Sequence, residues 1–279
     1  MWEKEQNLQQ SQAQQAQQGY YEEAQPQVID IGMVDADAVN AYMAKVFGWM
    51  FIGLMVTAAT TVAIIYGMDT SAAFESFVWT ALGGNLFFVI LIAQIGLVWA
   101  ISGRVAKMNP GTAKALYLLY ATLNGLTFGF VAVLFAYALL DGMFTIGLTF
   151  GITAVTFGIM AIYGLTTKTD LTRFGNLFFM GLIGLIIASV ANWFIGGAML
   201  DLVIIVFGLF LFMGLTAYHT NNIKNNFARI ALSPDGAYAV GARVDQEALA
   251  SNLAITGALS LYLAFINMFM FILRLLSRR

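Results

Sequence analysis

The sequence contains no cysteine and a single histidine, and each absence excludes a class of site. Without cysteine there is no disulfide framework, no thiolate metal site and no cysteine nucleophile. With one histidine there is no cluster of histidines that could hold zinc. We therefore expect neither a metal centre nor a bound cofactor.

Charged residues are also scarce, since they make up 10% of the 279 residues, whereas 60% are hydrophobic. A soluble domain carries roughly 25% charged and about 45–50% apolar residues. So few charges cannot cover a surface that faces water, which excludes a soluble globule and a disordered chain. The formal net charge of −2 gives no attraction for nucleic acid. The composition is that of a membrane protein whose partner is the lipid bilayer.

The hydropathy of the chain changes abruptly after Lys45. Residues 1–45 are rich in glutamine and acids, and this composition predicts a disordered cytoplasmic tail. Residues 46–279 contain seven apolar segments of the length that a spanning helix needs. The fold is therefore predicted to be all-α, a polytopic membrane protein with a seven-transmembrane-helix bundle, because a barrel would show short alternating segments instead. The predicted spans are 46–67, 86–103, 115–139, 143–164, 175–195, 199–218 and 253–274.

Basic residues are confined to alternate joints between these spans. The joints after the second, fourth and sixth spans carry lysine and arginine, and those after the first, third and fifth carry only acids. Because basic loops stay in the cytoplasm, this pattern predicts a cytoplasmic N-terminus. Seven crossings then put the C-terminus outside, although it ends in Arg274, Arg278 and Arg279. A crossing last span is favoured, with a re-entrant one as the alternative.

Two predicted spans carry the same glycine-containing string. Gly125 and Gly129 enclose Leu-Thr-Phe in the third span, as Gly147 and Gly151 do in the fourth. Small residues at this spacing let helix backbones approach closely in lipid. We therefore expect the third and fourth spans to pack as a close antiparallel pair through these glycines. The alternative is a glycine-lined pore wall.

Several kinds of chemistry are missing from the spans. No carboxylate lies in the middle of a predicted span, which argues against a proton-coupled transporter and against an intramembrane calcium site. Ser189 and Ser260 lie in spans, but neither has the sequence context of an exposed nucleophile. No phosphate-binding loop is present either. We therefore expect no enzymatic activity.

Four segments in order resemble one family. They are Leu118–Thr127, Tyr163–Leu171, Ala217–Lys224 and Ala258–Asn267, and the last contains the specific string Leu-Tyr-Leu-x-Phe-Ile-Asn. Together they resemble the bacterial branch of the Bax inhibitor-1 family, the transmembrane Bax inhibitor motif proteins. The resemblance implies a bacterial inner-membrane protein with the last helix at the centre of the bundle. It also implies a likeness to pH-sensitive calcium-leak proteins, with calcium or other cations as partners.

The family's pH-sensing site is altered in this sequence. The resemblance implies two aspartates that share a proton near the cytoplasmic ends of the sixth and seventh helices, and an arginine that latches to one of them. This chain has His219 at the first aspartate position and Ala264 at the second, vacated one. Arg104 matches the latch position. His219 and Arg104 are therefore the candidate gate and pH-sensor residues.

Three hypotheses follow from this altered site. In the first, cations leak through a pore that acid opens, because protonated His219 repels Arg104. In the second, the pore has lost its sensor and shows no pH dependence. In the third, the protein is a binding module that moderates a membrane protease through its tail and the loop Ser233–Gly236. The simpler alternatives are that His219 caps its helix and that Arg104 only anchors a cytoplasmic end.

Overall fold

The protein is built from long helices that follow the apolar segments of the sequence. In the computed structural model, residues 36–82, 84–104, 108–138, 142–232 and 246–278 are described, and they contain no strand. The helices of these residues are α2 (Ala36–Thr70), α3 (Ala72–Leu82), α4 (Asn85–Arg104), α5 (Pro110–Ala138), α6 (Gly142–Thr166), the short 3-10 helix η3 (Leu171–Phe174), α7 (Gly175–Ile195), α8 (Ala198–Leu232) and α9 (Gln246–Leu276).

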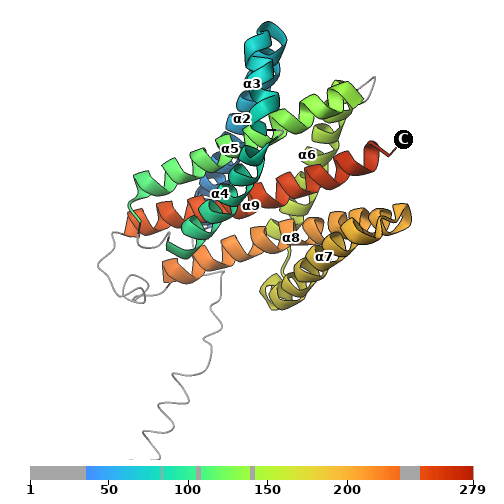
Figure 1. Cartoon of the computed structure of the whole chain (residues 1–279). Helices are drawn as coiled ribbons and strands as arrows, with labels where there is room; N and C mark the ends of the chain where they lie inside the picture. The colour runs from blue at the N-terminus through green and yellow to red at the C-terminus, as the bar shows by residue number, and fades with distance from the viewer. Residues whose placement is uncertain (1–35, 83, 105–107, 139–141, 233–245, 279) are drawn as a thin grey trace, which may run out of the picture. The chain divides into compact units, whose positions relative to one another are not determined.

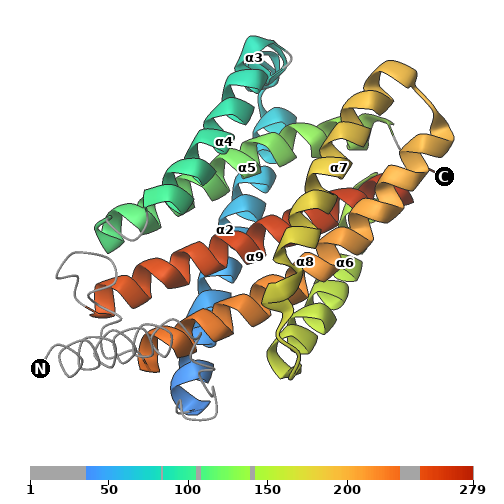
Figure 2. The ribbon, with the colours of Figure 1, turned by 90° about the horizontal axis from the view of Figure 1, so that it is seen from below.

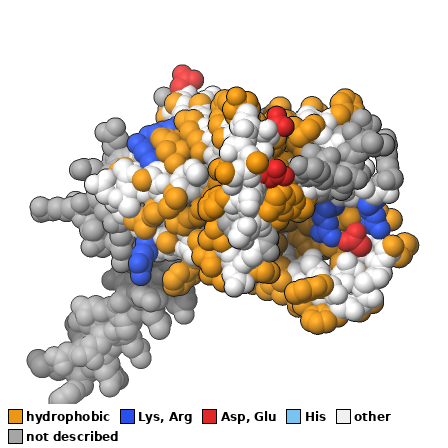
Figure 3. Space-filling model, turned by 45° about the horizontal axis from the view of Figure 1, so that its top comes forward, with side chains coloured by type: hydrophobic (Ala, Val, Ile, Leu, Met, Phe, Trp, Pro, Cys, Tyr) orange, Lys and Arg blue, Asp and Glu red, His pale blue; other side chains and the backbone are white. Residues whose placement is uncertain are grey.

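Seven of these helices, α2 and α4 to α9, are long and apolar enough to cross a membrane. The predicted number and order of spans, and the all-α polytopic fold, are thereby confirmed. Helix α3 was not predicted, and its 11 residues are too few to cross a bilayer. Figure 3 shows a face on which hydrophobic side chains predominate and charged side chains are few, as a spanning domain requires.

Helix α2 begins at Ala36 rather than at residue 46. The predicted disordered tail is therefore wrong for residues 36–45, which are helical, while residues 1–35 lie outside the described residues. The ring of Tyr42 stacks on Phe227 of α8, with centroids 4.2 Å apart. The early start follows from four buried residues at helical spacing: Val39, Tyr42, Met43 and Val46. The neighbouring residues are polar or small, so the hydropathy of this segment does not reveal the narrow apolar stripe.

Helix α9 contacts α2, α5, α6 and α8. Figures 1 and 2 show it passing between α5 and α8. In the most apolar segment of α9, 56% of the residues are buried within the protein, compared with 6% in that of α7. These contacts favour the expected placement of the last helix at the centre of the bundle, which stays a prediction.

Tyr262 of α9 connects this helix to two others. Its hydroxyl lies 2.7 Å from Oγ1 of Thr57 in α2, and its ring meets the rings of Tyr117 and Tyr120 in α5 edge to face. Apolar burial does little to join helices in lipid, so hydrogen bonds and close ring contacts contribute more of the association. The buried Tyr262 is therefore a main connection of α9 to α2 and α5.

The four glycines that were expected to join the third and fourth spans have different surroundings. A Cβ built on Gly125 would lie 2.5 Å from Cβ of Thr60, and one on Gly129 would be nearly as close to another α2 residue. A Cβ on Gly147 or Gly151 would meet nothing within 4 Å. The predicted pairing of α5 with α6 through these glycines is therefore wrong. The glycines of α5 face α2 instead. Two helices that follow each other in the sequence need not pack through the faces that carry their glycines.

The arginines near the C-terminus are paired with the start of α8. Nη2 of Arg274 lies 2.5 Å from Oδ1 of Asp201, and Nη1 of Arg278 lies 3.3 Å from Oδ2. Asp201 lies in the first turn of α8, so the pairing accounts for arginines at this end of the bundle. Helix α9 also runs without a break to Leu276. The structure therefore supports a crossing last span rather than a re-entrant one.

Replacing Asp201 by asparagine is expected to lower the free energy of unfolding by about 1–2 kcal/mol, because two ion pairs of partly exposed side chains are lost. The measurement is an unfolding titration in mild detergent. Asp69→Asn, at the exposed end of α2, is the matched control, with an expected change within about 0.5 kcal/mol. Equal effects of the two substitutions would show that the Asp201 pairs contribute nothing.

Candidate functional site: a cavity between α7, α8 and α9

The two positions at which the resemblance expects aspartates lie in one cavity. His219 of α8 and Ala264 of α9 both line a space of about 700 Å³ between α7, α8 and α9. These residues are far apart in the sequence, and packing of α8 against α9 brings them together. The two positions that the resemblance singles out, His219 and Ala264, therefore lie together in this structure.

One face of α9 supplies most of the polar character of this cavity. Ser260, Ala264 and Asn267 line it at intervals of four and three residues, the spacing of one helix face. Ser189 of α7 joins them from the other side. The spacing of Ser260, Ala264 and Asn267 is visible in the sequence, whereas the position of Ser189 beside them depends on the packing of α7.

Each of these polar groups already donates one hydrogen bond within its own helix. Ser189 Oγ, Ser260 Oγ and Asn267 Nδ2 each donate to the carbonyl oxygen four residues earlier in the same helix, at 2.7, 3.1 and 2.8 Å. Each side chain keeps an oxygen with lone pairs that can accept a hydrogen bond, and Asn267 also keeps its second Nδ2 hydrogen. The cavity therefore offers neutral oxygen acceptors that suit water or a weakly held cation.

Charged side chains do not contribute to this cavity. Among the described residues that line it there is no Asp, Glu, Lys or Arg. The described part of the chain also holds no group of three or more acids or histidines that could bind a metal ion. Calcium is held tightly where several oxygen ligands, usually with carboxylates among them, converge. The chemistry available here is neutral oxygen and one imidazole.

Aromatic rings stand at the end of the cavity where α7 begins. The ring of His219 lies 5.3 Å from that of Tyr218, which in turn lies 5.5 Å from Phe178. The Tyr218 hydroxyl is 2.8 Å from the place that a Cβ on Gly175 would occupy. Only glycine at this position lets the hydroxyl approach α7 so closely.

Two of the four family-like segments contact each other next to these rings. Asn221 of α8 accepts from the backbone N–H of Leu171 at 3.1 Å and donates to the carbonyl of Gly164 at 3.3 Å. Lys224 Nζ donates to the carbonyl of Leu165 at 2.8 Å. The polar residues of the segment Ala217–Lys224 therefore fix the turn that leads into η3 and α7.

Arg104 is not part of this site. It is the exposed last residue of α4, a helix that packs on α3 and α5, and it does not line the cavity. Its side chain makes no hydrogen bond or ion pair within the described part of the chain. The structure thus does not bring Arg104 and His219 together, and the latch role of Arg104 stays a prediction.

Comparison with known proteins shows the family of this chain. The family model described as "Inhibitor of apoptosis-promoting Bax1" matches residues 39–279. The chain belongs to the Bax inhibitor-1 family. Among its relatives, the inner membrane protein YbhL of Escherichia coli (strain K12) is 37% identical over 246 residues, covering 86% of this chain and 93% of YbhL. A protein of Deinococcus radiodurans is 36% identical over 245 residues, with 87% and 93% covered.

The likeness to YbhL also bears on where this Bax inhibitor-1 protein resides. YbhL is an inner membrane protein by name, and this chain carries seven helices that can cross a membrane. It is therefore a multi-pass protein of the bacterial inner membrane.

Proposed function

We propose that this protein is a passive leak pathway for cations, calcium included, and that the ions pass the cavity lined by His219 and Ala264. The observation that carries the proposal is the meeting of these two positions with three side-chain oxygens in one cavity. Conduction needs sites that hold an ion weakly enough to release it. Neutral oxygens meet this requirement, because each of them holds an ion only weakly.

The orientation of the pathway is part of the proposal. Basic residues follow α4, α6 and α8, and short basic loops stay in the cytoplasm. The N-terminus and the aromatic end of the cavity are then cytoplasmic. The Asp201 ion pairs at the opposite end of α8 then face the periplasm.

His219 is proposed to set the pH dependence of this leak through its own charge. A protonated imidazole would place a positive charge in a cavity whose described lining holds no acid. Like charges repel strongly where water is scarce, so cation flux should fall as the pH is lowered. Because Arg104 does not line the cavity, this response replaces the acid-opened pore expected from the sequence.

The test is calcium flux into liposomes that contain the purified protein, measured from about pH 8 down to about pH 4, because the imidazole of His219 is largely buried. The unmodified protein should conduct less at the acidic end. His219→Ala and His219→Asn should remove this pH response and keep the neutral-pH flux within about twofold, because neither side chain takes up a proton in this range. An unchanged pH profile in both variants would eliminate His219 as the sensor, and no flux at any pH would overturn the leak itself.

A second candidate function is that of a binding module which moderates a membrane protease without transport. It is favoured by α7, whose apolar segment is only 6% buried and whose Trp193 is 85% exposed. Residues 1–35 of the tail and the loop Ser233–Gly236, put forward as contact surfaces, lie outside the described residues. Deletion of residues 1–35, which precede α2 in the sequence, should leave a leak unchanged but weaken a binding module.

A further inference from the structure

We propose that a second cavity, a cleft between α2 and α6, holds one acyl chain of a zwitterionic phospholipid. This inference is independent of the proposed leak, because the cleft and the cavity at His219 share no lining residue. The two spaces lie against different faces of α9, and only the cleft reaches α2 and α6.

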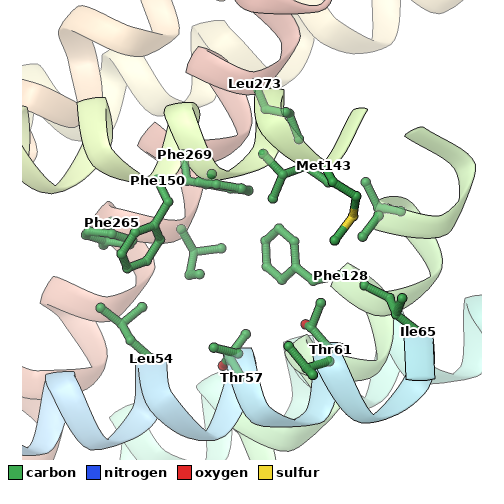
Figure 4. A pocket seen from close by; sticks show the side chains of 17 residues that line it. Leu54, Thr57, Thr61, Ile65, Phe128, Met143, Phe150, Phe265, Phe269 and Leu273 are labelled. Carbon is green, nitrogen blue, oxygen red and sulfur yellow. The ribbon is translucent and has the colours of Figure 1, made fainter. Parts of the chain in front are cut away.

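The cleft has an open mouth and a closed floor. Its volume is about 300 Å³. Val62 of α2 and Met143 of α6 stand at the mouth with 63% and 56% of their surface exposed, whereas Phe265 and Phe269 of α9 are buried at the floor. Figure 4 shows the side chains of Phe128, Met143 and Phe269 around the central space. Because its walls are membrane-spanning helices, the mouth opens toward lipid.

The walls of the cleft accept only an apolar occupant. Its two polar side chains are threonines of α2, and both already have partners within the protein. Thr57 Oγ1 lies 2.9 Å from the carbonyl oxygen of Ala121 and 2.7 Å from the Tyr262 hydroxyl, and Thr61 Oγ1 donates to the carbonyl of Gly125 at 3.1 Å. A sugar, a nucleotide or an ion would lose its water here without new hydrogen bonds. An acyl chain makes no hydrogen bonds with water and therefore loses none when it enters the cleft.

Gly147 of α6 provides the space at one wall. It lines the cleft, and a Cβ built on it meets nothing within 4 Å. Close packing therefore does not require glycine at this position. A larger side chain there would instead take up room that the cleft leaves free.

The charges beyond the cleft match a zwitterionic headgroup. On α2, Asp69 lies one turn beyond the lining residue Ile65 and is exposed. On α9, Arg274 follows the lining residue Leu273, and two arginines share the single carboxylate of Asp201 there. One wall thus ends in an acid and the other in a cluster with excess positive charge. An ammonium group and a phosphate, as in phosphatidylethanolamine, complement these two ends.

The experiment uses phosphatidylethanolamine with a photoreactive diazirine in one acyl chain. The full-length protein is reconstituted in liposomes with this lipid, irradiated and digested, and the labelled peptides are quantified by mass spectrometry. Labelling of the Trp193 region of α7, which faces bulk lipid, serves as the internal reference. Gly147→Leu fills the cleft, and Gly151→Leu is the matched control, because it places the same side chain in open space outside the lining.

The expected result is labelling of Met143 and Phe269 above the reference in the unmodified protein and in Gly151→Leu. In Gly147→Leu this labelling should fall to the level of the reference, because the leucine side chain takes up the space that the acyl chain would occupy. Phosphatidylethanolamine should label the cleft more than phosphatidylglycerol with the same chain. Labelling that is no greater than the reference, that falls equally in both variants, or that is as strong with phosphatidylglycerol would overturn the proposal.

Discussion

Aspartate at both His219 and Ala264 is expected to raise calcium flux into liposomes about tenfold at neutral pH, because a cleft lined by charge of one sign concentrates counter-ions by about this factor or more. The two positions line one cavity, so both new carboxylates would face the same space. Carboxylate oxygens are preferred ligands of calcium. Acidification should reverse the gain, since two neighbouring carboxylates share a proton and lose their charge as the pH falls.

The matched control is His219→Asn combined with Ala264→Asn. These amides have the size of aspartate but no charge, so flux should stay near that of the unmodified protein, with no new pH response. The single variant Ala264→Asp should give a smaller gain, because it adds one carboxylate instead of two. If the paired aspartates and the paired asparagines conduct equally, the cavity is not on the ion pathway.

Alanine at Gly125 is expected to lower the free energy of unfolding by about 2 kcal/mol, whereas alanine at Gly147 should raise it by up to about 1 kcal/mol. A Cβ at Gly125 would lie 2.5 Å from Cβ of Thr60 and 2.8 Å from the carbonyl oxygen of Thr57, so α5 and α2 must separate. At Gly147 nothing lies within 4 Å, and alanine only gains helix propensity there.

The two variants form their own control, because both glycines begin the same string, Gly-Leu-Thr-Phe-Gly. Unfolding titrations of the two variants in the same detergent would measure the difference. A destabilisation of equal size in both would mean that α6 also packs closely through its glycines. No destabilisation in Gly125→Ala would mean that α2 and α5 can repack around a methyl group.

The sequence predicted the spans well and their ends less well. Runs of about 20 apolar residues identify a spanning helix without any knowledge of its neighbours, since every such helix must satisfy its own backbone in lipid. The early start of α2 at Ala36 and the short helix α3 were missed. The start of α2 depends on a few apolar residues within polar surroundings, where contacts with other helices decide whether a helix forms. Helix α3 is apolar but has only 11 residues, so a search for spans does not detect it.

The candidate site was only partly accessible to sequence reasoning. The resemblance identified His219 and Ala264, and the structure places both in one cavity. Arg104 was grouped with them by motif order, but it is exposed at the end of another helix. The polar face formed by Ser260, Ala264 and Asn267 was present in the helical spacing of α9. Its importance depends on α7 and α8, which enclose it.

By itself, the sequence determined that this chain is an all-α membrane protein with seven spans and a family-specific pair of positions without aspartate. Hydropathy and motif identity are properties of a segment, so they can be predicted from that segment alone. The tertiary structure decided which faces of the helices meet. The two glycines of the same string are closely packed in α5 and open in α6, because α2 covers one pair and leaves the other uncovered. A cavity likewise exists only between helices, and no segment contains it.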